Sequence, residues 1–255
     1  MSADVTRDFA FGLPKAELHL HLEGTLEPDL KLALARKNGV DIGQSTVEEV
    51  QATYQFNDLT SFLAVYYPAM DVLQDEDDFH DLAAAYFERA RANGVVRAEC
   101  FFDPQAHTSR GIAIETVIRG YHRAVVEARE AGLSADLILC FLRDMSAQSA
   151  LETLQAALPY KDMFIGVGLD SDERDNPPTK FAEVFALARE AGLHVTMHCD
   201  IDQVGSIDNI RAALIELGAE RLDHGTNIVE DPELVAYARD HGIGLTSCPL
   251  SNSFV

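Results

Sequence analysis

The chain has 255 residues, of which 47% are hydrophobic, enough to bury the core of one large domain. Its 42 acidic residues outnumber 20 basic ones and give a formal net charge of -22. This balance argues against nucleic acid as a partner, because contacts to its phosphates need clusters of Lys and Arg. No apolar run approaches the ~18 residues that would span a bilayer, and no signal-peptide pattern opens the chain. We therefore expect a cytoplasmic protein with neither nucleic-acid nor membrane partners.

The predicted elements alternate between short apolar runs and longer amphipathic ones. In chain order, the predicted strands span residues 16–22, 95–102, 135–142, 164–169, 194–199, 221–224 and 243–248. The predicted helices span residues 27–38, 59–73, 77–92, 112–131, 178–191, 207–217 and 231–240. Glycines close most of these helices, as expected for repeated βα units.

The strands resemble those of a parallel sheet, since several are almost continuously apolar, as in residues 136–142. A (β/α)8 TIM-like barrel is the natural architecture, and it places its active site at the carboxyl ends of the strands. An open doubly wound sheet is the alternative, but no Gly-rich phosphate loop follows any strand. Only seven strands are counted. We therefore expect a single barrel domain over residues 1–255 that lacks its last βα unit.

The four cysteines lie in or at the ends of apolar, strand-like runs and show no CxxC pairing. This distribution favours reduced thiols over a disulfide framework. The cysteines are Cys100, Cys140, Cys199 and Cys248.

Two histidines of the first strand form the strongest local signal. Side chains alternate between the faces of a strand, so His19 and His21 project together while the intervening leucines face the other way. Two adjacent imidazoles can supply half of a divalent metal site. The competing interpretation is a strand whose polar face holds two histidines by chance.

His198, at the polar end of the fifth strand, is the candidate third ligand. Three imidazoles leave coordination positions open for water, as a hydrolytic metal site requires. Zn²⁺, one per chain, would lower the pKa of that water toward ~7. Nitrogen ligands accept several first-row metals, so the identity of the ion stays open.

His224 ends the sixth strand and could orient or deprotonate the water; alternatively, it is a rim histidine held by Asp223. Other polar residues fall at strand ends, and we expect them around the same mouth: Glu99, Asp103, Asp170, Asp200, Ser251 and Asn252. Four histidines outside strand ends are assigned no chemistry, namely His80, His107, His122 and His241.

These residues resemble the adenosine/adenine deaminase family of the amidohydrolase superfamily, and most of all its adenine deaminase branch. The resemblance runs over essentially the whole chain, and its most specific part is residues 13–28, LPKAELHLHLEGTLEP. The other matching segments are LDHG at 222–225, CPLSN at 248–252, YQFN at 54–57, FFDPQ at 101–105 and GLDS at 168–171.

The resemblance implies that His19, His21 and His198 bind zinc and that His224 stands beside the hydrolytic water. It places Glu23 where nucleoside-specific relatives commonly carry an Asp that addresses the ribose. The longer Glu resembles the branch that acts on free bases. With Asp170 and Ser171, Glu23 is assigned to substrate binding. The implied reaction is hydrolytic loss of ammonia from a 6-aminopurine, with adenine becoming hypoxanthine.

Two departures from the family pattern affect these expectations. Family members usually follow the strand-five histidine with Ala-Gly-Glu, and an ungapped match puts Ile201 where the proton-shuttling Glu stands. Asp200 would share the face of His198 if the strand continued, so it is the substitute acid. Relatives also continue into a strand-eight Ser-Asp-Asp-Pro segment, without which we expect weak or no activity from this chain.

Several alternatives stay open. The substrate could be adenosine or an N6-substituted adenine, or another amine-bearing heterocycle such as a pterin. A catalytically impaired purine-binding homologue is the non-enzymatic alternative. The expected partner is a small purine molecule, and the sequence leaves a homo-oligomer open.

Overall fold

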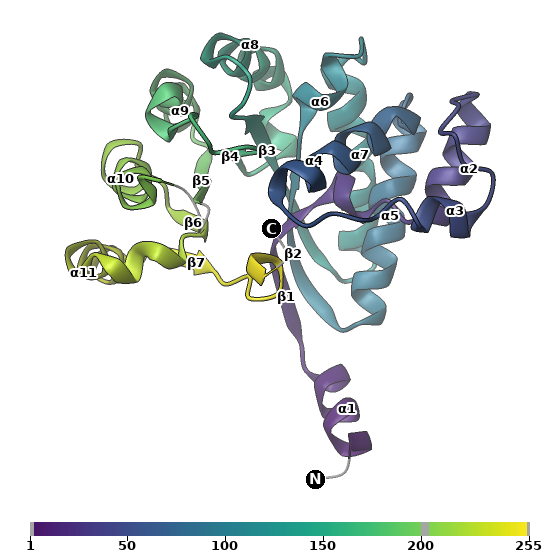
Figure 1. Ribbon diagram of the computed structural model, residues 1–255, viewed down its shortest axis with the longest axis horizontal. Helices are drawn as coiled ribbons and strands as arrows, with labels where there is room; N and C mark the ends of the chain where they lie inside the picture. Colours follow the sequence, from purple (N-terminus) through teal and green to yellow (C-terminus); the bar gives the residue numbers. More distant parts are fainter. Residues whose placement is uncertain (1–2, 200–203, 254–255) are drawn as a thin grey trace.

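The computed structural model describes residues 3–199 and 204–253. Its seven parallel strands form one sheet in the order in which they occur along the chain. The strands are β1 (Lys15–His21), β2 (Val95–Phe102), β3 (Ser134–Leu142), β4 (Gly166–Asp170), β5 (His194–Cys199), β6 (Arg221–His224) and β7 (Gly244–Thr246). Figure 1 shows the sheet curling into a nearly closed barrel with helices on its outside. The predicted TIM-like barrel is confirmed.

The helices in chain order are α1 (Ala3–Gly12), α2 (Pro28–Asn38), α3 (Val47–Gln51), α4 (Leu59–Ala69), α5 (Glu76–Ala92), α6 (Pro104–Thr108), α7 (Ile114–Glu130), α8 (Ala147–Ala157), α9 (Ala182–Glu190), α10 (Ser206–Arg211) and α11 (Pro232–His241). A short 3-10 turn, η1 (Leu22–Thr25), follows β1 directly.

Three helices inserted between β1 and β2 begin at capping boxes, in which side chain and backbone of two residues satisfy each other. Thr46 caps α3, Asp58 caps α4 and Asp75 caps α5. These caps fix the residue at which each of the three helices begins. The predicted helix 59–73 is interrupted because Pro68 lies in its last turn, and a 3-10 turn, Met70–Val72, follows.

Other boundaries also differ from prediction. The predicted helix 207–217 consists of α10 and a π turn, Ala212–Glu216. The predicted strand 164–169 begins two residues later, at Gly166. Helix α8 is absent from the prediction. Its buried residues, Ala150, Thr153, Leu154 and Ala157, recur at helical spacing, so the signal for this helix was present in the sequence.

Close approaches between elements depend on glycine. A Cβ atom on Gly168 of β4 would lie 2.6 Å from Sγ of Cys140 on β3. A Cβ atom on Gly120 of α7 would lie 2.5 Å from the backbone oxygen of Glu76 on α5. Strand β4 and helix α7 can therefore pack as they do only because these two residues have no side chain.

The two ends of the sheet meet through side chains. Within residues 3–199 and 204–253, no backbone ladder joins β7 to β1. However, Thr246 Oγ1 of β7 lies 3.0 Å from Nδ1 of His19 on β1. The barrel thus curls far enough to bring its first and last described strands into contact at the mouth, the end of the barrel formed by the carboxyl ends of the strands.

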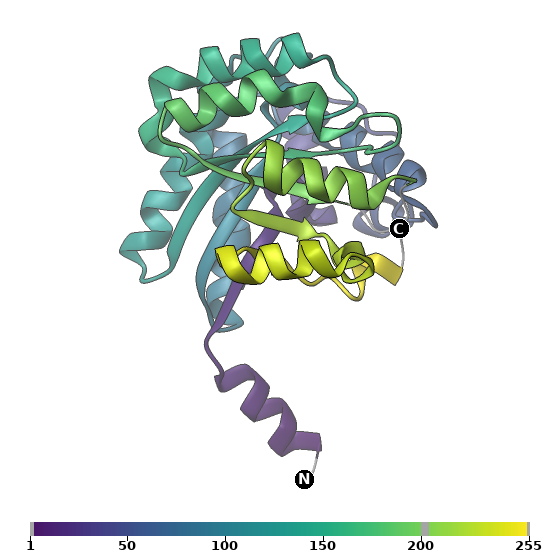
Figure 2. The same ribbon diagram turned by 90° about the vertical axis from the view of Figure 1, so that its left-hand side faces the viewer.

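Helix α1 stands away from the barrel, as both views show (Figures 1 and 2). Lys15 bridges α1 and the body, because its Nζ donates to the backbone oxygens of Phe11 in α1 at 3.5 Å and of Asn93 at 2.8 Å. None of the four cysteines, all within the described part of the chain, forms a disulfide. No helix among the described residues has the length and apolar character needed to cross a membrane.

Candidate metal centre and active site

Three imidazoles converge at the mouth, as the sequence predicts. Nε2 of His198 lies 2.8 Å from Nε2 of His19 and 3.0 Å from Nε2 of His21. The three side chains form a set whose ligand atoms all lie within 4.8 Å of one another. His19 and His21 leave the same face of β1, and His198 comes from β5 across the barrel.

In each ring, the hydrogen-bond partner of Nδ1 indicates which nitrogen carries the proton. His198 Nδ1 lies 3.1 Å from the backbone oxygen of Leu169, and His21 Nδ1 lies 3.2 Å from a carboxylate oxygen of Asp170. A backbone oxygen only accepts hydrogen bonds, and so does the carboxylate of Asp170 when it is ionised. Both Nδ1 atoms therefore carry the proton. The lone pair of each neutral ring is therefore on Nε2.

The same reasoning applies to His19 through one further step. Thr246 Oγ1 donates to Asp223 at 3.0 Å, which uses its only proton. Thr246 must then accept from Nδ1 of His19, 3.0 Å away. Three Nε2 lone pairs thus point at one another with no proton between them, an arrangement that a cation at their centre would stabilise. The donor set fits a divalent metal ion.

Burial keeps two of these rings unprotonated. Desolvation, followed by the neighbouring His21 and His224 rings, lowers the pKa of His19 to about 2. Desolvation, followed by His19 and His21, lowers the pKa of His198 well below its usual value. Neutral imidazole is the form that binds metal, so both nitrogens are available as ligands at neutral pH.

Asp170 and Asp103 extend the donor set on the side of His21. Both are almost fully buried, and they form a second potential metal-binding group with His21. Burial, followed by the nearby carboxylates of Asp170 and Glu23, raises the pKa of Asp103 well above its usual range. One oxygen of each aspartate, Oδ1, has no hydrogen-bond partner in the described structure.

His224 lies beside the three rings. Its ring centroid is 4.8 Å from that of His19 and 5.7 Å from that of His198. Its Nδ1 lies 2.7 Å from Oδ1 of Asn252, a carbonyl oxygen that can only accept. His224 therefore carries its proton on Nδ1 and its lone pair on Nε2, the arrangement of a general base.

The alternative partner, Asp223, is occupied elsewhere. It is fully buried and accepts from Thr196 and Thr246 at 2.5 and 3.0 Å. His224 has a left-handed backbone with φ of 62°, uncommon for any residue but glycine. Such backbone conformations cluster at functional sites, where the surrounding structure holds them.

Glu23 is buried in η1 and bonded through one oxygen. Its Oε1 accepts from the backbone nitrogen of Asp103, from Nε2 of His107 and from the hydroxyl of Tyr121, each at 3.1 Å. Its Oε2 is buried without a partner. No chemistry was assigned to His107 from the sequence. It lies in α6, shortly after the end of β2, and contacts Glu23, a predicted substrate-binding residue.

Helix α4 covers this part of the site with two tyrosines. Tyr66 packs closely on Gly24, next to Glu23, and its buried hydroxyl has no hydrogen-bond partner in the described structure. Burial, followed by the carboxylates of Asp103 and Glu23, raises the pKa of Tyr66 well above its usual value. Burial, followed by the carboxylates of Asp103 and Asp170, raises the pKa of the Tyr67 hydroxyl well above its usual value. Ser171, after β4, has a left-handed backbone with φ of 72°.

Two predicted placements require comment. Glu99, expected at the mouth, instead pairs with Arg97 at 2.7 Å and with Arg221 at 2.5 Å, because it lies in the middle of β2 rather than at its end. Asp200, the expected acid, and Ile201 lie outside the described residues. The remaining site residues, His19, His21, Glu23, Asp170, Ser171, His198 and His224, all lie at the mouth or in turns that follow its strands.

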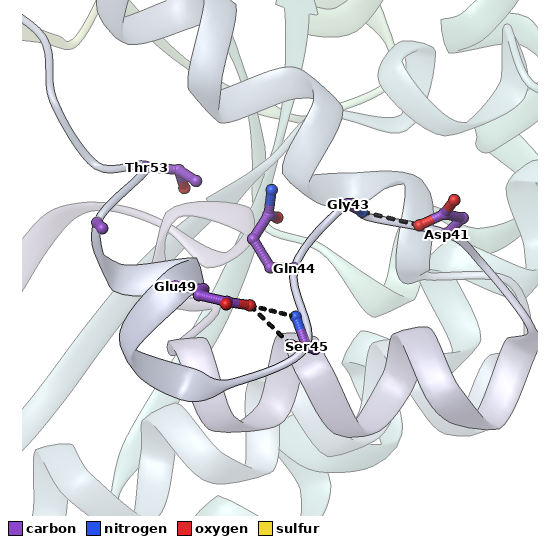
Figure 3. A pocket seen from close by; sticks show the side chains of 7 residues that line it. Asp41, Gly43, Gln44, Ser45, Glu49 and Thr53 are labelled. Carbon is purple, nitrogen blue, oxygen red and sulfur yellow. Dashed lines mark hydrogen bonds between the residues drawn. The ribbon is translucent and has the colours of Figure 1, made fainter.

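A separate surface hollow lies between α2 and α3 (Figure 3). The carboxylate of Glu49 lines it and accepts from the backbone nitrogen and hydroxyl of Ser45 at 2.7 and 2.9 Å. These bonds close the turn before α3, and they lower the pKa of Glu49. The hollow is therefore explained by helix capping and does not belong to the histidine site.

A β/α barrel with three histidines and a fourth beside them at its mouth defines the class of metal-dependent barrel hydrolases. The adenosine deaminase family model matches residues 14–255. The chain belongs to that family, whose members are deaminases of the amidohydrolase type.

Similar proteins agree with this assignment. An adenine deaminase of Geotalea uraniireducens is 54% identical over 241 residues, which cover 94% of this chain and 67% of that protein. The crystal structure of adenine deaminase from Arthrobacter aurescens matches with a TM-score of 0.89 and 48% identity, over 94% of this chain and 73% of the other. An amidohydrolase from Burkholderia ambifaria with bound Zn matches with a TM-score of 0.84 and 31% identity, over 100% and 70%.

Proposed function

We propose that the protein is a zinc-dependent adenine deaminase that converts adenine and water into hypoxanthine and ammonia. The observation that carries this proposal is the convergence of Nε2 of His19 and Nε2 of His21 on Nε2 of His198, at 2.8 and 3.0 Å. Similarity to two adenine deaminases at 48% and 54% identity supports the choice of substrate. The bound Zn of the amidohydrolase from Burkholderia ambifaria supports the choice of metal.

The three Nε2 lone pairs would hold the zinc ion. When bound, zinc lowers the pKa of a coordinated water toward ~7. Asp170 accepts from Nδ1 of His21 and fixes the orientation of that ring, as outer carboxylates commonly do. The unpartnered Oδ1 of Asp170 faces no competing donor and supports its assignment to substrate binding together with Ser171.

His224 would act as the base. Its Nε2 lone pair, fixed by the bond from Nδ1 to Asn252, accepts a proton from the attacking water. The water oxygen would form a bond to C6 of the purine while a ring nitrogen is protonated. His224 would then pass the proton to the exocyclic amino group, the bond from C6 to that nitrogen would break, and ammonia would leave. The proton of the C6 hydroxyl would return to the acid, which leaves the carbonyl of hypoxanthine. Asp200 is proposed, from its spacing to His198 alone, to protonate the purine ring.

The test is ammonia release by the purified full-length protein in the presence of zinc, compared across adenine, adenosine and N6-methyladenine. Adenine is expected to react fastest, with hypoxanthine as the product. Ile201→Glu and Asp200→Asn then test which residue protonates the purine ring. If Asp200 is that acid, Asp200→Asn abolishes turnover. Protein that holds zinc in a 1:1 ratio but releases no ammonia from any 6-aminopurine would contradict the proposal.

A further inference from the structure

The barrel sheet separates between β4 and β5 as these strands approach the mouth. Among the described residues, the backbone ladder between the two strands has only two pairs and ends at Val167 and Val195. On its other side, β5 stays paired with β6 as far as Cys199. In the described structure, a neighbouring strand therefore holds the end of β5 that carries His198 on one side only.

Side chains replace the backbone ladder where it ends. The backbone oxygen of Cys199 accepts from the backbone nitrogen of Gly225, directly after β6, at 2.9 Å. Successive carbonyl groups point to opposite sides of a strand, so the backbone oxygen of His198 faces β4. It accepts from Nη1 of Arg143 at 3.0 Å. In turn, the backbone oxygen of Leu169 on β4 accepts from Nδ1 of His198 at 3.1 Å.

Arg143 directly follows β3, and its side chain is fully buried. Its Nε donates to the backbone oxygen of Asn176, in the segment after β4, at 3.1 Å. Glu173 of the same segment supplies a countercharge, with Oε2 3.5 Å from Nη1. The backbone nitrogen of Arg143 donates to the backbone oxygen of Asp170 at 3.0 Å. One residue thus joins the end of β5 to the end of β4 and to the segment that follows it.

The chemistry of these contacts requires a guanidinium group. Its planar fork offers donors in several fixed directions, whereas the ammonium group of a lysine is a single point charge. Burying the cation costs free energy, which the nearby carboxylate of Glu173 offsets only in part. The gain is that a charged donor fixes the His198 carbonyl more firmly than a neutral one would.

We propose that Arg143 is a positioning residue for the metal ligand His198. By holding the backbone oxygen of His198, it keeps Nδ1 of that ring on Leu169 and Nε2 directed at His19 and His21. Arg143 acts through His198 and not on the reacting atoms. This inference rests on the metal centre of the proposed function, but it does not depend on which substrate the protein uses.

Two variants separate this role from a general contribution to the cluster. Arg143→Lys keeps a positive charge beside Glu173, but one ammonium group cannot reach the oxygens of both Asn176 and His198. Lys180→Met is the matched control. Nζ of Lys180 donates to the backbone oxygen of Arg143 and to Oδ1 of Asn176, both at 2.9 Å, yet has no hydrogen bond to His198 among the described residues.

Two measurements on the full-length protein report the position of the His198 ring. Competition with a chromogenic chelator gives the zinc affinity, which should fall by about 10- to 100-fold in Arg143→Lys and stay close to the wild-type value in Lys180→Met. NMR of isotopically labelled histidines in the metal-free protein shows which ring nitrogen carries the proton. His198 should have its proton on Nδ1 in the wild type and in Lys180→Met, and should show both forms in Arg143→Lys.

Unchanged zinc affinity with an unchanged His198 signal in Arg143→Lys would refute the proposal, and so would equal losses in Lys180→Met. If Arg143→Lys does not fold, Arg143→Met combined with Glu173→Gln must show the same two effects. This pair removes both buried charges, which often costs less than removing one.

Failure of the proposed function would be seen separately. A full-length protein that deaminates no purine contradicts that function alone, since neither measurement needs a substrate. If the protein also binds no zinc, the NMR signal of His198 decides the inference by itself, and a signal that is the same in the wild type and in Arg143→Lys overturns it.

Discussion

Nδ1 of His19 and Oγ1 of Thr246 are 3.0 Å apart although 227 positions separate the two residues in the chain. One belongs to the first strand and supplies a candidate ligand, and the other belongs to the last described strand. Because Thr246 also donates to Asp223, its hydroxyl fixes which nitrogen of His19 faces the other two rings. The orientation of this ligand therefore depends on closure of the barrel.

Replacing this hydroxyl should weaken metal binding. In Thr246→Val the Nδ1 proton of His19 loses its oxygen acceptor, and we expect zinc affinity to fall by about 10- to 100-fold. Competition with a chromogenic chelator measures the change. Thr196→Val is the matched control, since Thr196 also donates to Asp223 but has no hydrogen bond to any of the three rings among the described residues. Equal losses in both variants would refute the role of Thr246.

His224 should be needed for turnover and not for metal binding. The left-handed backbone at this position makes Asn the gentlest replacement, because Asn tolerates positive φ better than most residues. In His224→Asn we expect kcat for ammonia release to fall by about 10²- to 10⁴-fold with zinc content unchanged. Asn252→Ala, which removes only the acceptor for Nδ1, should lose less. Loss of the metal in His224→Asn would instead identify His224 as a ligand.

The contact between Gly168 and Cys140 can be tested by a double-mutant cycle. Gly168→Ala would place a Cβ atom 2.6 Å from the buried sulfur, and we expect a loss of about 1–3 kcal/mol in the free energy of unfolding. Cys140→Ala removes that sulfur and should make the second substitution much less costly. Urea unfolding of the four proteins measures the coupling. Additive losses would show that the close approach is not what destabilises the alanine variant.

The lowered pKa values of His19 and His198 predict how the stability of the metal-free protein changes with pH. Unfolding restores the ordinary histidine pKa of about 6.5, so below that pH the unfolded chain binds protons that the folded chain does not. Stability is therefore complete above about pH 6.5 and is lost as the pH falls. Each group contributes a slope of up to about 1.4 kcal/mol per pH unit.

Urea unfolding with a chelator present, repeated between about pH 7 and pH 5, measures this slope. His198→Gln removes one buried titrating group and should flatten it. His194→Gln, on the same strand but with an exposed side chain, should leave it unchanged. A wild-type slope that survives in His198→Gln would assign the effect to other groups.

The sequence was sufficient for the barrel and the three converging histidines because both depend on local regularities. Almost continuous apolar runs mark buried parallel strands, and alternation along β1 puts His19 and His21 on one face. Strands β2, β5 and β6 have the predicted bounds. Helix α8 was missed although its buried residues recur at helical spacing.

The surroundings of Glu23 could not be predicted in the same way. His107 lies 84 positions further along the chain, and the sequence does not show which face of the short helix α6 turns inward. The clustering of Asp103 with Asp170 likewise depends on how two strand ends meet in space. A signal was available in hindsight, since His107 and Arg110 are three residues apart and so share one side of a helical turn.

Helix α1 has a practical consequence for handling the protein. It projects from the end of the barrel opposite the mouth, with the aromatic rings of Phe9 and Phe11 largely exposed to solvent. A segment with so few tertiary contacts opens independently of the body. Limited proteolysis should cut near residue 12 first and release a trimmed protein that crystallises more readily and still loads zinc.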